Sequence, residues 1–115
     1  MPLVHDVSEL YKYIYGLGKK IPKRDRFGLH SKIETLCLEL LIKIIEAVFT
    51  TRTDKPPILN VTRINIETLK RLVRIEWELE IITAKKYEEL TFRLQKISKM
   101  TSGWMKYLIN RQRSS

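Results

Sequence analysis

The feature that most constrains the fold is the recurrence of apolar residues at every third or fourth position along four long segments. This spacing places side chains on one face of an α-helix. The chain has only four glycines and four prolines in 115 residues, so few residues can interrupt these segments. The alternation of apolar and polar residues that marks a half-buried strand is absent from the sequence. The pattern therefore predicts an all-α protein.

The length fits one domain over residues 1–115, because domains most often have about 100–150 residues. Four amphipathic helices joined by mostly short connections favour an antiparallel up-down four-helix bundle. We expect the helices at about residues 6–20, 29–51, 62–82 and 84–110.

The ends of these segments carry local signals. Asp6, with Glu9 three residues later, has the arrangement of a capping box at the start of the first helix. Residues 50–62 are rich in Thr, Pro and Asn and are expected to form the longest loop. Glycine and proline are both missing between the third and fourth segments, so we expect a tight turn at 82–84, with Thr83 capping the last helix.

The second segment, residues 29–51, is apolar on two faces. A helix of this kind is either central to a core or packed against a second chain. A domain this small has little room for a fully surrounded helix, so the sequence predicts an oligomer. The second apolar stripe consists of Leu38, Ile42, Ile45 and Phe49.

Charge is distributed unevenly along the chain. Twenty-two Lys and Arg against thirteen Asp and Glu give a net charge of +9. Residues 1–30 carry six basic and three acidic side chains, residues 31–82 carry eight of each, and residues 83–115 carry eight and two. Such an excess attracts polyanions. We expect a positive patch formed by the first and last segments, with a neutral middle.

The sequence offers no matched set of catalytic groups. His5 and His30 lack a nearby cysteine pair, so they do not form a zinc site, and His30 is interpreted as a polar residue at a helix end. The single cysteine, Cys37, lies in an apolar run, which predicts a buried thiol and excludes an intramolecular disulfide. Phosphate-binding and nucleophile motifs are also absent. We expect no enzymatic activity, no metal site and no cofactor.

Membrane association is not expected either. No stretch approaches the roughly 20 apolar residues that a membrane-spanning helix requires, and the first residues do not have the pattern of a signal peptide. The sequence therefore predicts a cytoplasmic protein.

Three stretches carry a family resemblance. The run from Ile21 to Leu29, the run from Leu69 to Arg74, and the closing run from Ile97 to Leu108 with its Gly-Trp pair resemble small bacterial four-helix-bundle proteins. That family includes proteins encoded in ribosomal-RNA intervening sequences and the accessory variability determinants (Avd) of diversity-generating retroelements. The basic excess and the arginine-rich tail make the chain more similar to the Avd branch.

The resemblance to the Avd branch implies a ring-shaped homopentamer. It implies binding to the reverse transcriptase of the retroelement and to its template RNA or DNA, in support of mutagenic cDNA synthesis, and it implies no catalytic residues. The alternative is a bundle of the intervening-sequence type, which acts as a protein-interaction or structural module. The candidate binding residues are the basic side chains Lys23, Arg24, Arg26, Lys70, Arg71, Arg74, Lys106 and Arg111.

Overall fold

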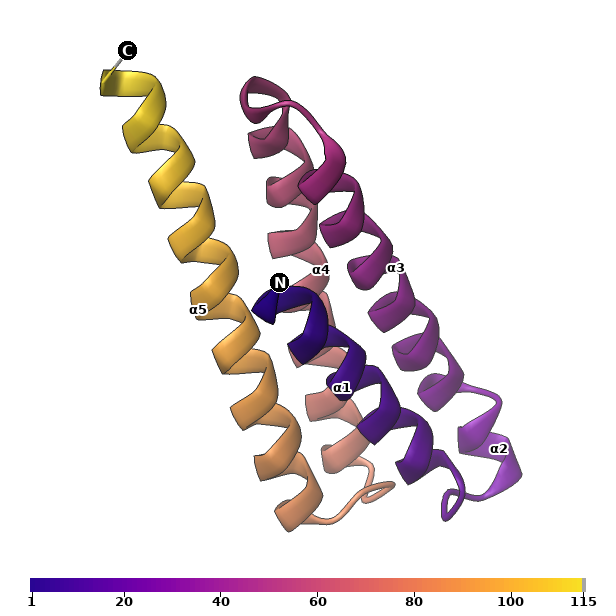
Figure 1. Cartoon of the computed structure of the whole chain (residues 1–115). Coiled ribbons are helices and arrows are strands. Elements are labelled where there is room, and N and C mark those ends of the chain that lie inside the picture. Colours follow the sequence, from indigo (N-terminus) through magenta and orange to yellow (C-terminus); the bar gives the residue numbers. More distant parts are fainter. Residues whose placement is uncertain (115) are drawn as a thin grey trace.

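The computed structural model describes residues 1–114, and over that range it contains only helices and their connections. The four long helices run in alternating directions (Figure 1). The predicted all-α class with four helices is confirmed, whereas the ring assembly remains a prediction. The elements are α1 (Pro2–Gly18), α2 (Lys23–Arg26), α3 (Leu29–Phe49), the 3-10 turn η1 (Arg52–Asp54), α4 (Lys55–Glu78) and α5 (Ala84–Ser114).

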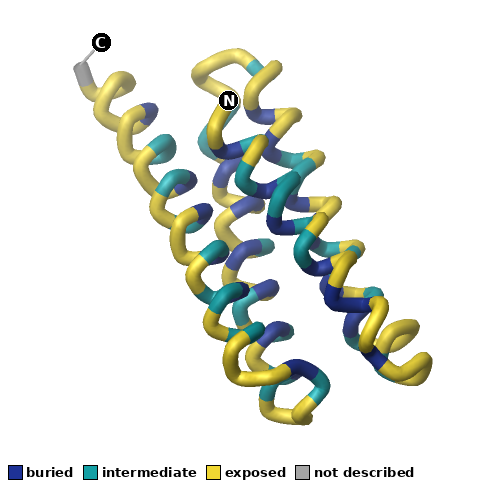
Figure 2. The backbone as a smooth tube through the Cα atoms, turned by 60° about the horizontal axis from the view of Figure 1, so that its bottom comes forward, coloured by how far each residue is buried: buried dark blue, intermediate teal, exposed yellow. Residues whose placement is uncertain are grey.

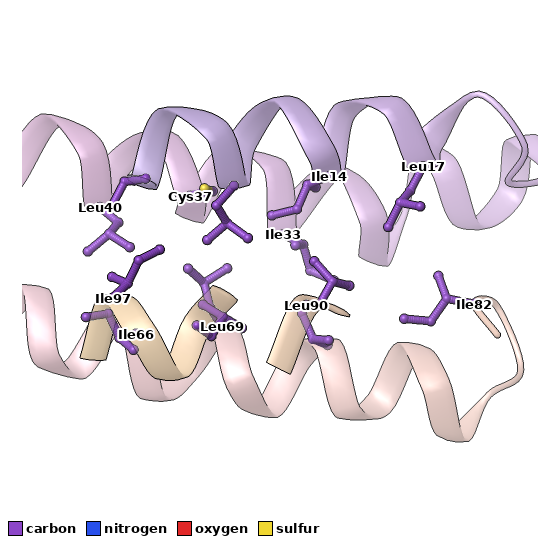
Figure 3. Close-up of a cluster of buried hydrophobic side chains, with 14 of the residues drawn as sticks. Ile14, Leu17, Ile33, Cys37, Leu40, Ile66, Leu69, Ile82, Leu90 and Ile97 are labelled. Carbon is purple, nitrogen blue, oxygen red and sulfur yellow. The ribbon is translucent and has the colours of Figure 1, made fainter. Parts of the chain in front are cut away.

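The core lies along the axis of the bundle, where all four long helices meet. Ile14, Ile33, Leu69 and Leu90 come from four different helices, and each is at most 1% exposed. Figure 3 shows these side chains pointing toward one another, and Figure 2 shows that the buried positions face the inside of the bundle. Cys37 is fully buried, as predicted, and burial raises the pKa of its thiol to about 12.

The first helix begins earlier than the sequence pattern predicts. It starts at Pro2 and ends at Gly18, so the predicted cap at Asp6 is wrong. Proline is tolerated in a first turn, because the N–H that it lacks would have no helical acceptor there. Asp6 lies inside the helix instead, and its carboxylate is 3.4 Å from the Nζ of Lys96 on α5.

The predicted long loop at 50–62 is also wrong. Helix α4 already begins at Lys55, and the connection from α3 is limited to residues 50–54, most of which form η1. Pro56 and Pro57 lie in the first turn of α4, where proline can start a helix rather than break it. The seven extra residues, about two helical turns, add Leu59, which is fully buried, to the core.

The turn between α4 and α5 lies at residues 79–83 rather than at 82–84. The N–H of Glu80 donates to the carbonyl of Trp77, and the N–H of Ile81 donates to the carbonyl of Glu76, both at 2.9 Å. These two bonds form a Schellman motif. It places Glu80 at a φ of 60°, a conformation that usually selects glycine. The predicted cap is confirmed, because the N–H of Lys86 donates to the Thr83 hydroxyl at 3.3 Å.

The long helices differ in length, and this difference shapes the molecule. Helix α5 has 31 residues and continues through Gly103 and past residue 110, whereas α1 has 17. The N-terminus therefore lies beside the middle of α5 (Figure 1). The bundle is elongated, with extents of 53 × 21 × 19 Å. Within residues 1–114, no helix is both long enough and apolar enough to cross a membrane.

The second apolar stripe of α3 lies on a face of its own, as its spacing predicted, and that face is on the outside of the chain. Ile42 is 62% exposed and Phe49 is 85% exposed, and Leu38 and Ile45 are each 39% exposed. We refer to Leu38, Ile42, Ile45 and Phe49 as the α3 stripe. The core-facing positions of the same helix, such as Leu40 and Ile44, are fully buried.

Candidate nucleic-acid interface

Three of the predicted basic residues lie together in a pocket between α4 and α5. Lys70, Arg71 and Arg74 line one side of it, and Tyr87 and Gln95 of α5 lie on the other. The pocket has a volume of about 260 Å³. Arg74 follows Lys70 by four residues and Arg71 by three, so it lies beside both on the helix surface.

The pocket continues toward the C-terminal end of α5. Arg71 also lines a second hollow with Arg63, and Arg63 in turn lines a third hollow with Lys106 and Arg113. Neighbouring hollows share these two arginines, so the three form one strip: its end pockets lie between α4 and α5, and its middle hollow is lined by α4 alone. We call this strip the basic groove; its cations are Arg63, Lys70, Arg71, Arg74, Lys106 and Arg113.

The basic groove carries a strong charge surplus. Six cations line it, against a single carboxylate, that of Glu67, which gives a net charge of +5. Among the described residues, Arg63, Arg71, Lys106 and Arg113 have no acidic partner within 4.0 Å. Unpaired cations on one face create the positive potential that raises the local concentration of a polyanion.

The other two cations of the groove are paired within α4. The Nζ of Lys70 is 3.4 Å from Glu67, and the Nε of Arg74 is 3.6 Å from Glu78. These pairs are solvated and lie one helical turn apart, so each contributes little to stability. A phosphate can replace the carboxylate partner of either side chain without exposing a buried charge.

The chain is similar to a known protein family. The chain matches the family model described as bAvd-like over residues 1–108. The chain belongs to the bAvd-like family. No curated protein matches it. The family match confirms the resemblance to accessory variability determinants that the runs at 21–29 and 97–108 indicated.

The remaining predicted site residues of this bAvd-like chain lie elsewhere. Lys23 and Arg24 are exposed on α2, as is Arg26. Helix α2 lies at the end of the bundle farthest from the C-terminus of α5 (Figure 1). Arg111 does not line the basic groove, and its guanidinium lies 5.9 Å from the ring centre of Tyr107. The structure therefore brings together Lys70, Arg71, Arg74 and Lys106, but neither the α2 cations nor Arg111.

Two groove residues were missed by sequence reasoning. Arg63 was expected to lie at the very start of a helix beginning near residue 62, but it lies in the third turn of α4. It is eight residues before Arg71, which places both on one helical face. Arg113 was assigned to the tail after residue 110, although α5 continues through it. A correct assignment of Pro56 and Pro57 to a helix start would have identified Arg63.

The opposite side of α5 has a different charge arrangement. Asp6 and Glu9 of α1 and Glu89, Arg93 and Lys96 of α5 line a pocket of about 230 Å³ together with Phe92. We call it the paired groove; its net charge is −1. The Arg93 guanidinium donates to Glu89 at 2.9 Å, and Lys96 pairs with Asp6 at 3.4 Å. Its cations are therefore compensated inside the chain.

A buried ion pair holds three helices of this bAvd-like chain together. His30 is 1% exposed and Glu76 is fully buried. His30 Nδ1 lies 2.8 Å from Glu76 Oε2, and Nε2 lies 2.8 Å from the carbonyl oxygen of Ile14. A carbonyl oxygen only accepts, so Nε2 carries a proton that it donates. His30 lies in the first turn of α3, as predicted, but it joins α1 and α4 rather than facing solvent.

The protonation of this pair follows from its surroundings. Burial alone lowers the pKa of His30, but the hydrogen bond and the charge of Glu76, with the Ile14 carbonyl, outweigh burial and raise that pKa above its ordinary value. Glu76 Oε1 has no hydrogen-bond partner among the described residues. The pair is closed to solvent, so its role is structural. In residues 1–114, no three His, Cys, Asp or Glu side chains are grouped so as to hold a metal ion.

Proposed function

We propose that this protein is a non-catalytic accessory protein of a diversity-generating retroelement. In this proposal it acts in the cytoplasm as a homopentamer. It binds the reverse transcriptase and its template RNA or DNA, and thereby supports mutagenic cDNA synthesis. Membership of the bAvd-like family is one support for this proposal.

The observation that carries the nucleic-acid part is the basic groove. Its net charge of +5 accounts for more than half of the +9 of the whole chain. Contacts from Lys and Arg to phosphates provide affinity that depends strongly on salt but conveys little sequence information. A strip of this kind suits a protein that binds a template whatever its base sequence.

The α3 stripe supports the oligomeric part of the proposal. Four apolar side chains at three- and four-residue spacing lie exposed on one helix face. A repeated contact through such a face buries apolar surface that a free chain leaves in water. We assign this stripe to the contact between subunits and the basic groove to the nucleic acid.

The nucleic-acid assignment is tested by comparing two double variants of equal charge change. Arg63→Gln/Arg71→Gln removes two unpaired cations from the basic groove, and Lys12→Gln/Lys96→Gln removes two cations that are paired with Glu9 and Asp6. We expect the first variant to bind labelled RNA and DNA more weakly. The slope of the logarithm of its association constant against the logarithm of the salt concentration should be smaller in magnitude by about 2. Equal losses in both variants, or none in either, would contradict the assignment.

The partner is tested by co-purification with the cognate reverse transcriptase. We expect Arg71→Glu/Arg74→Glu to reduce recovery of the enzyme relative to wild type, with nuclease treatment separating direct contact from contact through template. Undiminished recovery would remove these two residues from the proposed surface.

The assembly is tested by light scattering in solution. Five chains of 13.7 kDa give a pentamer of about 69 kDa. We expect Ile42→Ser/Phe49→Ser to reduce this mass, whereas Phe92→Ser, which changes a 67%-exposed residue of α5, should not. A monomeric wild type would rule out the pentamer.

The alternative is a protein-interaction or structural module of the ribosomal-RNA intervening-sequence type. The α3 stripe is compatible with it, because an exposed apolar face can also receive a different protein. This alternative predicts that neither RNA nor DNA binds, even at low salt.

A further inference from the structure

The end of the basic groove nearest the α4–α5 turn differs chemically from the rest. Beside its three cations the pocket there carries an aromatic ring and two uncharged polar groups, those of Tyr87, Thr91 and Gln95. Phosphate binding alone does not require such groups. We propose that the basic groove binds a single nucleic-acid strand and that one base of the strand occupies this pocket. The inference rests on the nucleic-acid binding proposed above.

The shape of the groove selects a single strand. Its two end pockets lie between α4 and α5, and the axes of packed helices are typically about 8–10 Å apart. A duplex is wider than this and would rest only on the rim. Proteins that read a duplex instead insert a protruding helix or ribbon into one of its grooves. The α5 residues of the two end pockets extend from Thr91 to Arg113, about 33 Å at 1.5 Å per residue, which suits a short run of nucleotides.

Tyr87 is positioned to receive a base. Its ring stacks on Trp77 with a centroid distance of 4.7 Å and an angle of 5° between the planes. Trp77 packs against the core, and it lines a different hollow with residues of the α4–α5 turn. One face of the Tyr87 ring is therefore covered by Trp77, and the same side chain lines the pocket. Single-strand-binding proteins combine a positive groove with aromatic rings in this way.

The neighbouring side chains complete the pocket. Thr91 and Gln95 follow Tyr87 at intervals of one helical turn, and both can donate and accept hydrogen bonds. Groups of this kind can bond to the edge of any base. Arg71 has no acidic partner in the described part of the chain, so it is available for the adjoining phosphate.

The strand preference is tested with one oligothymidine in two forms. Its affinity is measured by fluorescence anisotropy as a single strand and as a duplex with oligodeoxyadenosine, at the same length and salt concentration. We expect the single strand to bind at least tenfold more tightly. A duplex that binds equally or more tightly would overturn the inference and leave the proposed function standing, whereas failure of both forms to bind would overturn both.

The base pocket is tested with Tyr87 variants and an abasic strand of equal length. We expect Tyr87→Ala to weaken binding of oligothymidine about five- to 150-fold, the range for loss of one stacked base. Tyr87→Phe, which keeps the ring on Trp77, should bind nearly as wild type. The abasic strand should bind Tyr87→Ala and wild type equally. Equal losses on both strands would show a general disturbance of the groove and would overturn the base pocket.

Discussion

On the side of α5 that faces α4, six cations and one carboxylate line the basic groove. On the side that faces α1, two cations and three carboxylates line the paired groove. Both grooves are built from the same helix, and both contain lysine and arginine. The difference is that Lys96 and Arg93 have acidic partners at 3.4 and 2.9 Å, whereas Arg63 and Arg71 have none in the described structure.

This difference shows that the number of basic residues in a segment does not indicate where a polyanion can bind. The middle of the chain, residues 31–82, is neutral in total, yet its helix α4 supplies four of the six groove cations. One of its carboxylates, Glu76, is buried against His30 and adds nothing to the surface. Charge is segregated by helix face, and helix packing then decides which faces adjoin.

The largest expected effect comes from a substitution that destabilises the whole bundle, and with it both grooves. His30→Ala leaves the Glu76 carboxylate buried without a partner, and we expect it to lower the free energy of unfolding by about 3–5 kcal/mol. The double variant His30→Leu/Glu76→Met, which removes both charges, should recover most of this loss. Chemical denaturation measures both; a double variant no more stable than His30→Ala would contradict the ion-pair account.

The same pair predicts a pH dependence. Because the folded pKa of His30 lies above its ordinary value of 6.5, the stabilisation is fully present below that pH. It is lost as the pH rises through the folded pKa, since a deprotonated ring can no longer donate to both Glu76 and the Ile14 carbonyl. Denaturation curves of wild type at several pH values should show this loss. His30→Leu/Glu76→Met should not, and a loss of equal size in that variant would assign the effect to other groups.

The next prediction converts the paired groove into a basic one. Asp6→Asn, Glu9→Gln and Glu89→Gln together change its charge from −1 to +2 and release Arg93 and Lys96. We expect nucleic-acid affinity at low salt to rise by up to about tenfold, with a steeper salt dependence. Unchanged affinity would mean that the shape of the α4–α5 hollow, rather than the absence of acidic partners, makes the basic groove distinct.

Another prediction concerns the contact between the end of α1 and His30 of α3. A Cβ added at Gly18 would lie 3.2 Å from the ring of His30, which is held by two hydrogen bonds and has little freedom to move. We expect Gly18→Ala to destabilise the chain by about 1–2 kcal/mol. Gly16→Ala, which meets no atom within 4 Å, should stabilise the helix by up to about 1 kcal/mol. Thermal unfolding compares the two, and a stabilised Gly18→Ala would contradict the tight contact.

The smallest expected effect concerns the turn that joins the two helices of the basic groove. Glu80 adopts a φ of 60°, which costs a residue with a side chain roughly 1–2 kcal/mol. Glycine avoids that cost, but it makes the unfolded chain more flexible, which offsets part of the gain. We therefore expect Glu80→Gly to raise the free energy of unfolding by about 0.5–1 kcal/mol. Nucleic-acid affinity should not change. Glu78→Gly, inside α4, should instead destabilise, and equal effects of the two changes would contradict the assigned cap.

Part of the candidate site was predictable from the sequence. Lys70, Arg71 and Arg74 lie within five residues of one another on a helix, so their proximity follows from helical geometry alone. The inclusion of Lys23, Arg24 and Arg26 rested on local charge density, but the bundle places α2 at the end away from the C-terminus of α5 (Figure 1). The density of basic residues in one stretch of sequence carries no information about which helices lie side by side in the bundle.

Much of the fold was determined by the sequence itself. The three- and four-residue spacing specified the helices and the second apolar face of α3, because each depends only on the period of a helix. The apolar run around Cys37 specified its burial. Thr83 capped α5 as expected from its type and position.

Only the tertiary structure decided which faces adjoin. The basic groove depends on antiparallel packing that sets Arg63 beside Lys106, although they are 43 residues apart. The buried pair joins His30 and Glu76 across 46 residues. Helical periodicity specifies the face on which a residue lies, whereas the partner of that face is set by the packing of all four helices around one core.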